Sequence, residues 1–161
     1  VKIRINKHSS NKIIKKALQE KKIKEFSSIA NIKPETKFGS NTRFDFFITN
    51  KNDKVFIEVK NVTLSRKKGI AEFPDAVTSR GLKHIKELIK ASKKDFKIYI
   101  LYLVQRNDCK FFSIAKDIDP KYASELSKAV KNKLKILCYD CKFSSKGIKL
   151  NNQISFINDD Q

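Results

Sequence analysis

The residues from Phe96 to Gln105 are almost all apolar, and most of them are β-branched or aromatic. This composition is typical of a central strand that is covered on both faces. Asp119 followed by Pro120 is a helix-start signal, and a second apolar stretch from Leu134 to Cys141 follows that helix. The order of strand, helix and strand predicts an α/β chain with a mixed central β-sheet flanked by helices.

Three strands are expected earlier in the chain, and short turns join them into a meander. They cover Pro34 to Phe38, Thr42 to Thr49 and Val55 to Val62. Helical spacing of apolar residues predicts a helix from Ser9 to Glu20 before them. A further helix begins at Thr78 or Ser79, after a short strand from Ile70 to Phe73. The pattern therefore predicts one helix before the meander in the sequence and another after it.

The two ends of the chain carry weaker signals. Val1, Ile3 and Ile5 alternate with polar residues, which indicates a half-buried strand. Residues 143–157 form a terminal hairpin or edge strand around Gly147, and residues 158–161 are expected to fray. A length of 161 residues predicts one domain. Since the chain lacks methionine and opens on a strand pattern, we expect the natural N-terminus to lie upstream.

The charge balance is strongly basic. The chain has 36 Lys and Arg against 17 Asp and Glu, a formal net charge of +19. The electrostatic field of such a positive protein favours polyanionic partners, and nucleic acid is the first candidate. The alternative is that lysine fills solvated positions because of a biased genome composition, which identifies no site.

The cysteines and the hydropathy pattern exclude several classes of protein. Cys109, Cys138 and Cys141 are too few for a disulfide framework, and no second Cys pair accompanies the Cys138-x-x-Cys141 spacing. No apolar run approaches the roughly 20 residues of a membrane span, and no signal segment opens the chain. We therefore expect a cytoplasmic protein without a membrane anchor; the oligomeric state stays open.

Three side chains on neighbouring strands form the candidate catalytic centre. Glu58 and Lys60 share one face of their strand because side chains alternate along it, and Asp45 lies on the preceding strand. Two carboxylates can hold Mg²⁺, with Mn²⁺ as a substitute, and the lysine can orient an attacking water. The alternative is a structural ion pair, because both acids interrupt strongly apolar strands.

These residues also carry a family resemblance. The segments 43–46 (RFDF), 56–64 (FIEVKNVTL) and 73–81 (FPDAVTSRG), together with His84, resemble the sugar fermentation stimulation protein family. The likeness extends from Asn6 to Ile148, so it covers nearly the whole chain. It implies a restriction-endonuclease-like fold of the PD-(D/E)XK type, with an OB-like domain upstream that this chain lacks. It also implies DNA binding and a role in regulating sugar metabolism.

The resemblance places Asp45, Glu58 and Lys60 at the catalytic-motif positions, with Gln105 at the end of the next core strand. Related sites often include an acid from the first helix. That helix carries lysines here, so Glu20 or Glu35 would have to substitute. Other candidates are Asp75, in a turn before a helix start, and His84. His84 either faces the site or is an ordinary packed residue of its helix.

Basic residues near these segments are the candidate phosphate contacts. Phosphate contacts fix position and carry little sequence information. The candidates are Lys15, Lys16, Arg43, Arg66, Lys67, Lys68 and Arg80.

Three functions remain open from the sequence. The first is non-specific binding of single- or double-stranded DNA. The second is Mg²⁺-dependent hydrolysis of phosphodiester bonds, and the third is a protein-interaction module with a relic site.

Overall fold

A computed structural model of the chain describes residues 7–158. Within that range the order is α1 (Lys7–Gln19), a 3₁₀ turn (Lys24–Phe26), β1 (Asn31–Phe38), β2 (Thr42–Thr49), β3 (Lys54–Val62), β4 (Leu64–Lys67), β5 (Ile70–Phe73), α2 (Ser79–Ser92), β6 (Lys97–Val104), β7 (Phe111–Ile114), α3 (Pro120–Lys131), β8 (Lys135–Ser144), β9 (Gly147–Gln153) and β10 (Ser155–Ile157). The strand predicted over Val1 to Ile5 lies outside the described residues.

The larger sheet is mixed. Its strand order is β1-β2-β3-β6-β8-β9. The first three strands form the antiparallel meander, β3, β6 and β8 run parallel, and β9 returns antiparallel to β8. Gly147, with φ +121°, opens β9 in a backbone region that side chains disfavour. The mixed sheet predicted from the strand and helix order is therefore confirmed.

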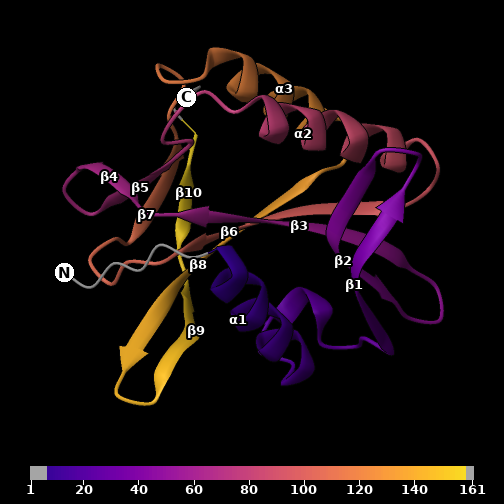
Figure 1. Cartoon of the computed structure of the whole chain (residues 1–161), viewed down its shortest axis with the longest axis horizontal. Coiled ribbons are helices and arrows are strands. Elements are labelled where there is room, and N and C mark those ends of the chain that lie inside the picture. The colour runs from indigo at the N-terminus through magenta and orange to yellow at the C-terminus, as the bar shows by residue number, and fades with distance from the viewer. Residues whose placement is uncertain (1–6, 159–161) are drawn as a thin grey trace.

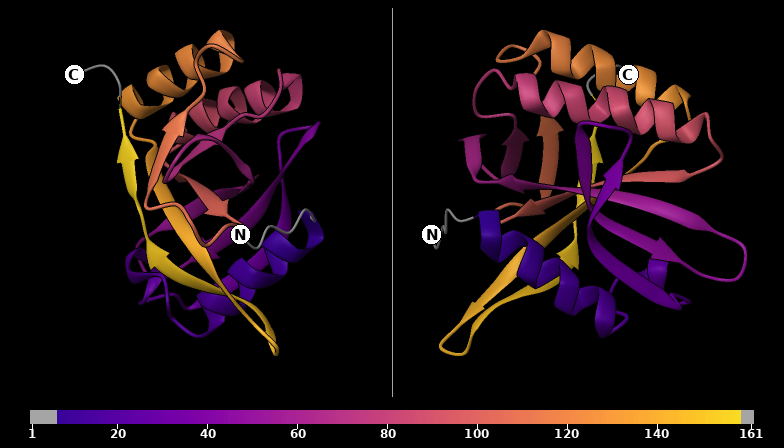
Figure 2. Two further views of the ribbon diagram at one scale, coloured as in Figure 1. Left: turned by 90° about the vertical axis from the view of Figure 1, so that its left-hand side faces the viewer. Right: turned by 45° about the vertical axis from the view of Figure 1, so that its right-hand side comes forward.

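Helices cover both faces of this sheet (Figures 1 and 2). Helix α1 packs on one face over a core that includes Ile14, Leu18 and Ile57. Helices α2 and α3 lie side by side on the other face, over a core that includes Ile85 and Tyr102. Burial of apolar side chains on both faces explains why β3 and β6 contain so few exposed positions. The sheet is the middle layer of three.

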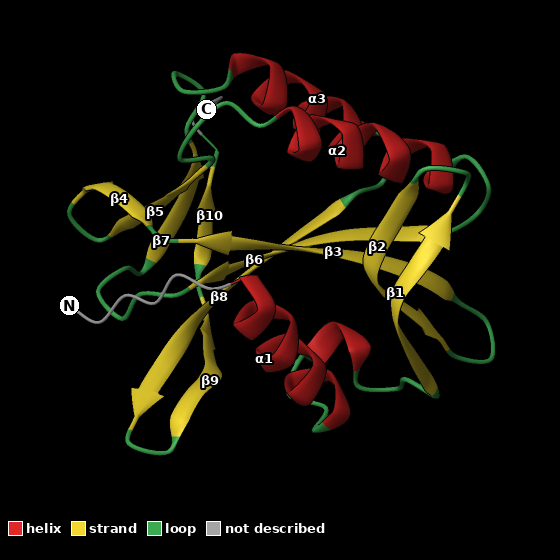
Figure 3. Cartoon of the chain, in the orientation of Figure 1, coloured by secondary structure: helices red, strands yellow, loops and turns green. Residues whose placement is uncertain are grey.

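A smaller sheet stands at one end of the molecule (Figure 3). Its order is β10-β7-β5-β4, with β7 parallel to both of its neighbours. The strand pattern predicted β5 but neither β7 nor this second sheet. Strand β7 is short and only two of its residues are buried, so it lacks the long alternation that identifies a strand in sequence.

The predicted elements match the structure closely in position. The helix expected from Ser9 begins at Lys7, and α2 has Thr78 as its N-cap, with the Thr78 side chain accepting a hydrogen bond from the Gly81 amide. Asp119 caps α3 in the same way through the Tyr122 amide, with Pro120 at its first position. The terminal hairpin around Gly147 is β8 with β9. No described helix is long and apolar enough to cross a membrane.

Candidate functional site

The site begins where β2 and β3 separate. The last paired residues are Phe46 and Ile57. Asp45, which precedes Phe46 in β2, lies just beyond that pair. Its carboxylate replaces the missing strand pairing, because Oδ2 accepts a hydrogen bond of 2.8 Å from the backbone N–H of Val59. The other oxygen, Oδ1, accepts one of 2.9 Å from the side-chain amide of Asn11 on α1. Asp45 therefore lies half-buried in a fork of the sheet, and the residue that binds it, Val59, follows Glu58 in β3.

Glu58, Lys60 and His84 form a buried cluster on the side of α2. Glu58 is 1% exposed, and its Oε1 lies 3.3 Å from Lys60 Nζ and 2.8 Å from His84 Nδ1. Lys60 Nζ lies 3.2 Å from the same histidine nitrogen. Phe56 packs in the core on this side and Ile57 in the core on the other, so the predicted alternation along β3 is confirmed. The structure thus brings His84 into contact with the Glu-x-Lys pair.

The electrostatics of the cluster favour an ionised glutamate. Burial alone would raise the pKa of Glu58, but the hydrogen bond from His84 and the positive charge of Lys60 outweigh burial, and its pKa is lowered. A carboxylate at this position is therefore charged at neutral pH. A buried charge of this kind is retained only where partners or a bound cation compensate it.

A second chain of hydrogen bonds joins the ends of β3 and β6 to α1. Gln105 is fully buried, and its Nε2 donates to Ser10 Oγ over 2.8 Å. Ser10 in turn donates to Asn61 Oδ1 over 3.1 Å. Since Ser10 precedes Asn11, these bonds fix the first turns of α1 next to Asp45. Gln105 therefore contributes to the same region, as its position at a strand end suggested.

Three buried side-chain oxygens of the described residues have no hydrogen-bond partner. They are Asn11 Oδ1, Glu58 Oε2 and Gln105 Oε1. Each belongs to a residue of the fork or of the hydrogen-bond chains around it. Buried polar atoms in folded proteins are nearly always paired, so an orphan acceptor needs an explanation. Asn11 and Gln105 belong to the hydrogen bonds on the α1 side of the sheet, and Glu58 belongs to the cluster on the α2 side. Each of these oxygens is an acceptor that a bound cation, a water molecule or a substrate hydrogen would satisfy.

Asn11, Ser10 and Asn61 were missed at the sequence level. The family resemblance predicts an acid from the first helix, with Glu20 or Glu35 as the substitute. Both are exposed, with Glu20 3.9 Å from Lys16. The side chain of α1 that reaches Asp45 is Asn11. The sequence does not mark Asn11 as a site residue, because asparagine is common at the start of a helix for reasons of capping alone.

Arg66 is held in an ion-pair network in the smaller sheet. Its guanidinium donates to Glu72 Oε2 over 2.6 Å and to both oxygens of Asp117 over 2.6 and 2.8 Å. The network ties β4 to β5 and to the loop after β7. Lys67 and Lys68 are exposed at the tip of the β4–β5 hairpin. Arg66 therefore already has carboxylate partners, whereas the two lysines face solvent.

The remaining candidates lie at the surface of the domain. Exposed side chains are those of Lys15, Lys16, Arg43, Asp75 and Arg80. The backbone N–H of Thr78, at the start of α2, donates to Asp119 Oδ2 over 2.9 Å and is therefore already bonded. Arg80 follows on the exposed first turn, so it and not the Thr78 amide is positioned for an anion.

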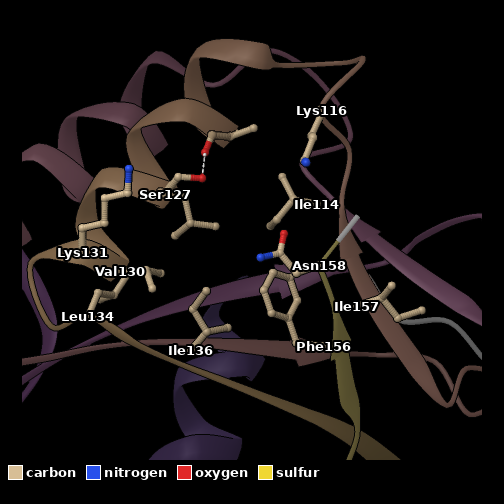
Figure 4. A pocket seen from close by; sticks show the side chains of 12 residues that line it. Ile114, Lys116, Ser127, Val130, Lys131, Leu134, Ile136, Phe156, Ile157 and Asn158 are labelled. Carbon is tan, nitrogen blue, oxygen red and sulfur yellow. Dashed lines mark hydrogen bonds between the residues drawn. The ribbon is translucent and has the colours of Figure 1, made fainter. Parts of the chain in front are cut away.

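A separate hollow of about 460 Å³ lies between α3 and the ends of β7, β8 and β10 (Figure 4). Its lining is mainly apolar, with Leu126, Val130 and Phe156 among its residues, and it contains no carboxylate. Among residues 7–158, no group of three His, Cys, Asp or Glu side chains is arranged to hold a metal. A cation at the fork would therefore be bound by the carboxylates together with amide oxygens, water or a substrate oxygen.

The comparison with protein families shows which family the chain belongs to. The family model described as Sugar fermentation stimulation protein RE domain matches residues 8–147. The chain belongs to the sugar fermentation stimulation protein family. A homologue from Pelagibacter ubique is 47% identical over 154 residues, which are 96% of this chain and 66% of that protein. One from Ruegeria sp. is 42% identical and covers 87% and 61%.

A solved member of the sugar fermentation stimulation protein family has the same fold. The structure of SfsA from Pyrococcus furiosus, described as in complex with Ca²⁺, superimposes with a TM-score of 0.88 at 26% identity, over 96% of this chain and 66% of that one. The fold is the nuclease-like one that the resemblance implied. The chain spans about two thirds or slightly less of the length of these relatives.

Proposed function

We propose that this domain binds DNA through phosphate contacts and holds a divalent cation at the fork between Asp45 and Glu58. The observation that carries the proposal is a pair of unpartnered buried oxygens in a chain of net charge +19. They are Glu58 Oε2, on the residue before Val59, whose amide binds Asp45, and Asn11 Oδ1, on the residue whose amide binds Asp45. A relic ion pair would be expected to satisfy its own acceptors, so these oxygens favour a site that receives a ligand. The solved relative in complex with Ca²⁺ supports a cation as that ligand.

The donor set fits a hard cation. Mg²⁺ and Ca²⁺ bind carboxylate and amide oxygens and keep water molecules in their remaining positions. Asp45 and Glu58 Oε2 would hold the ion, and Asn11 Oδ1 is an amide oxygen on the residue that contacts Asp45. When bound, such an ion neutralises phosphate charge and makes a coordinated water more acidic. The chain's own contribution is to fix these oxygens in a rigid fork.

A basic groove on the exposed side of α2, the helix that carries His84, offers a path for the phosphate backbone. It lies between the β1–β2 turn and the exposed side of α2, has a volume of about 600 Å³, and we name it the α2 groove. Lys83 Nζ donates to the carbonyl of Asn41, which fixes the turn against the helix. Lys94 lies 5.5 Å from the ring centre of Phe38. The lysines that line the groove are Lys83, Lys90, Lys93 and Lys94.

The groove carries mainly positive charge. It shares helix α2 with the buried cluster, since Lys83 in its lining precedes His84 in the sequence. The one acid in its lining is Glu87, which accepts a hydrogen bond of 2.8 Å from Lys90. Positive side chains along a groove favour a nucleic-acid backbone without reading its sequence. We therefore place the DNA along α2, with a phosphate near the fork.

The test is fluorescence anisotropy of labelled single- and double-stranded DNA with the whole chain, in Ca²⁺ and in chelator. We expect binding that weakens steeply as salt rises. Lys90→Gln with Lys94→Gln should reduce the slope of log K against log salt by about 1.8 for duplex DNA, since each phosphate contact contributes about 0.9. The matched control is Lys142→Gln with Lys149→Gln, a cross-strand pair in the β8–β9 hairpin.

The control should leave the slope nearly unchanged, because the hairpin extends away from α2 (Figure 1). Absence of DNA binding at low salt would refute the proposal. An equal effect of both double variants would refute the path along α2 while leaving DNA binding in place.

A second candidate, Mg²⁺-dependent phosphodiester hydrolysis, is favoured by the contact of 3.3 Å between Lys60 Nζ and Glu58 Oε1. This contact places a positive charge at the fork, where it could stabilise charge on a phosphate or orient a water. Incubation with DNA and Mg²⁺ or Mn²⁺ tests it. Cleavage that Lys60→Ala and Asp45→Ala abolish while binding persists supports an enzyme; binding without cleavage excludes this candidate.

A further inference from the structure

His84 is fixed firmly against the site by its helix. Its side chain is buried at 7% exposure on α2, in the helix whose neighbouring residues Ile85 and Leu88 are fully buried in the core. A Cβ on Gly81 would meet Thr78 side-chain atoms at 2.8 and 2.9 Å, so the first turn of α2 is packed tightly onto its cap. A side chain on such an element has little freedom to move away from Glu58.

The contacts of His84 act on one oxygen of Glu58. Both His84 Nδ1, at 2.8 Å, and Lys60 Nζ, at 3.3 Å, approach Oε1. The short distance to Nδ1 fits an N–H donor on that nitrogen. The contact of 3.2 Å between Lys60 Nζ and the same nitrogen is then no hydrogen bond, because both atoms carry hydrogen. The second oxygen, Oε2, is buried and receives no hydrogen bond from the described residues. One oxygen of the carboxylate thus has two donors nearby, and the other has no donor among the described residues.

The orientation of the carboxylate depends on His84 specifically. With Lys60 as the one remaining donor, the flexible ammonium group would follow the carboxylate as it turns about its terminal bond and would not fix its plane. A planar ring on a packed helix fixes the direction of its N–H bond, and so it fixes the plane of the Glu58 carboxylate. The direction in which the second oxygen points is then fixed as well.

We propose that His84 is a positioning residue that orients Glu58 so that Oε2 is presented to a divalent cation. This inference rests on the proposed cation site and deepens it. His84 touches neither the cation nor the phosphate; it acts through Glu58, as outer ligands of metal sites do. The competing account is that His84 only stabilises the fold as one member of a buried ion-pair cluster.

The test compares two amide substitutions in the whole chain. His84→Asn places an N–H donor near the position of Nδ1, whereas the longer side chain of His84→Gln places it near the position of Nε2. Calorimetric titration with Ca²⁺ gives the affinity, and thermal unfolding in chelator gives the stability of each variant. Tyr102→Phe is the control. Tyr102 lies on β6, paired with Lys60, and the change removes its buried hydrogen bond of 2.6 Å to Tyr122 on α3.

We expect His84→Gln to weaken Ca²⁺ binding about 10- to 100-fold and His84→Asn to stay within about threefold of the parent chain. Tyr102→Phe should lower the melting temperature without changing the affinity. Equal Ca²⁺ affinity in the parent chain and His84→Gln would overturn the positioning role and leave the cation site intact. If the parent chain itself does not bind Ca²⁺, the cation site is refuted and the role of His84 with it.

Discussion

Two charged clusters in this domain look alike in composition and differ in how they are satisfied. The cluster of Arg66, Glu72 and Asp117, which we call the Arg66 clamp, pairs every carboxylate oxygen with a guanidinium N–H at 2.6 to 3.2 Å. The cluster at the fork leaves Glu58 Oε2 without a partner. The clamp uses all of its carboxylate acceptors, which we call closed, whereas the fork keeps one buried acceptor without a donor among the described residues, which we call open.

The difference shows that charge alone does not mark a site. By residue type, Arg66 is an attractive phosphate contact, yet its donors are occupied by Glu72 and Asp117. By residue type, Glu58 and Lys60 could form a simple ion pair, yet the pair leaves one buried acceptor over. What separates a structural cluster from a functional one is whether its hydrogen-bonding capacity is used up.

The largest expected effect is at the fork. Glu58→Gln keeps the shape of the side chain and removes its charge. It should reduce Ca²⁺ affinity by on the order of 100-fold or more, because the effect of removing a direct ligand is at least that of removing an outer one. Calorimetric titration measures it. A variant that binds Ca²⁺ like the parent chain would show that the open oxygen is not a ligand.

The Arg66 clamp should respond in the opposite way. Arg66→Ala leaves Glu72, which is 6% exposed, without its cation. The melting temperature should fall by several degrees, since each kcal/mol corresponds to roughly 2–4 °C in a domain of this size. Ca²⁺ affinity should stay unchanged. Loss of Ca²⁺ binding in this variant would break the distinction between a closed and an open cluster.

A smaller effect is expected from pH. The hydrogen bonds from Arg66 lower the pKa of Asp117 to about 2. Because the folded value lies below the unfolded one, this contribution to stability is present above about pH 4 and is lost as pH falls toward 2. Thermal unfolding of the parent chain and Asp117→Asn should differ at pH 6 and converge near pH 2. The difference is small because Asp117 is exposed and salt screens it. A constant difference across this range would contradict the assignment.

Periodicity and end signals predicted most of the larger sheet and all three helices. The apolar run through β6, the meander and the caps at Thr78 and Asp119 are local patterns, and local patterns survive in sequence. The alternation along β3 also predicted that Glu58 and Lys60 share a face.

The parts that sequence reasoning missed depend on contacts between distant segments. Nothing in the neighbourhood of Asn11 indicates that its amide reaches Asp45, 34 residues later. The chain from Gln105 to Ser10 spans 95 residues. Strand β7 pairs with β5 and β10 and not with a sequence neighbour, so the second sheet leaves no periodic trace. Long-range polar contacts are decided by the packing of the whole fold.

The most direct test of the open fork is a crystal of the chain grown with Mn²⁺, with anomalous scattering used to locate the ion. The account predicts a peak at roughly 2.0–2.4 Å from Glu58 Oε2 and from a carboxylate oxygen of Asp45, with the contact between His84 Nδ1 and Glu58 Oε1 retained. A fork without an anomalous peak, or a peak confined to the Arg66 clamp, would contradict it.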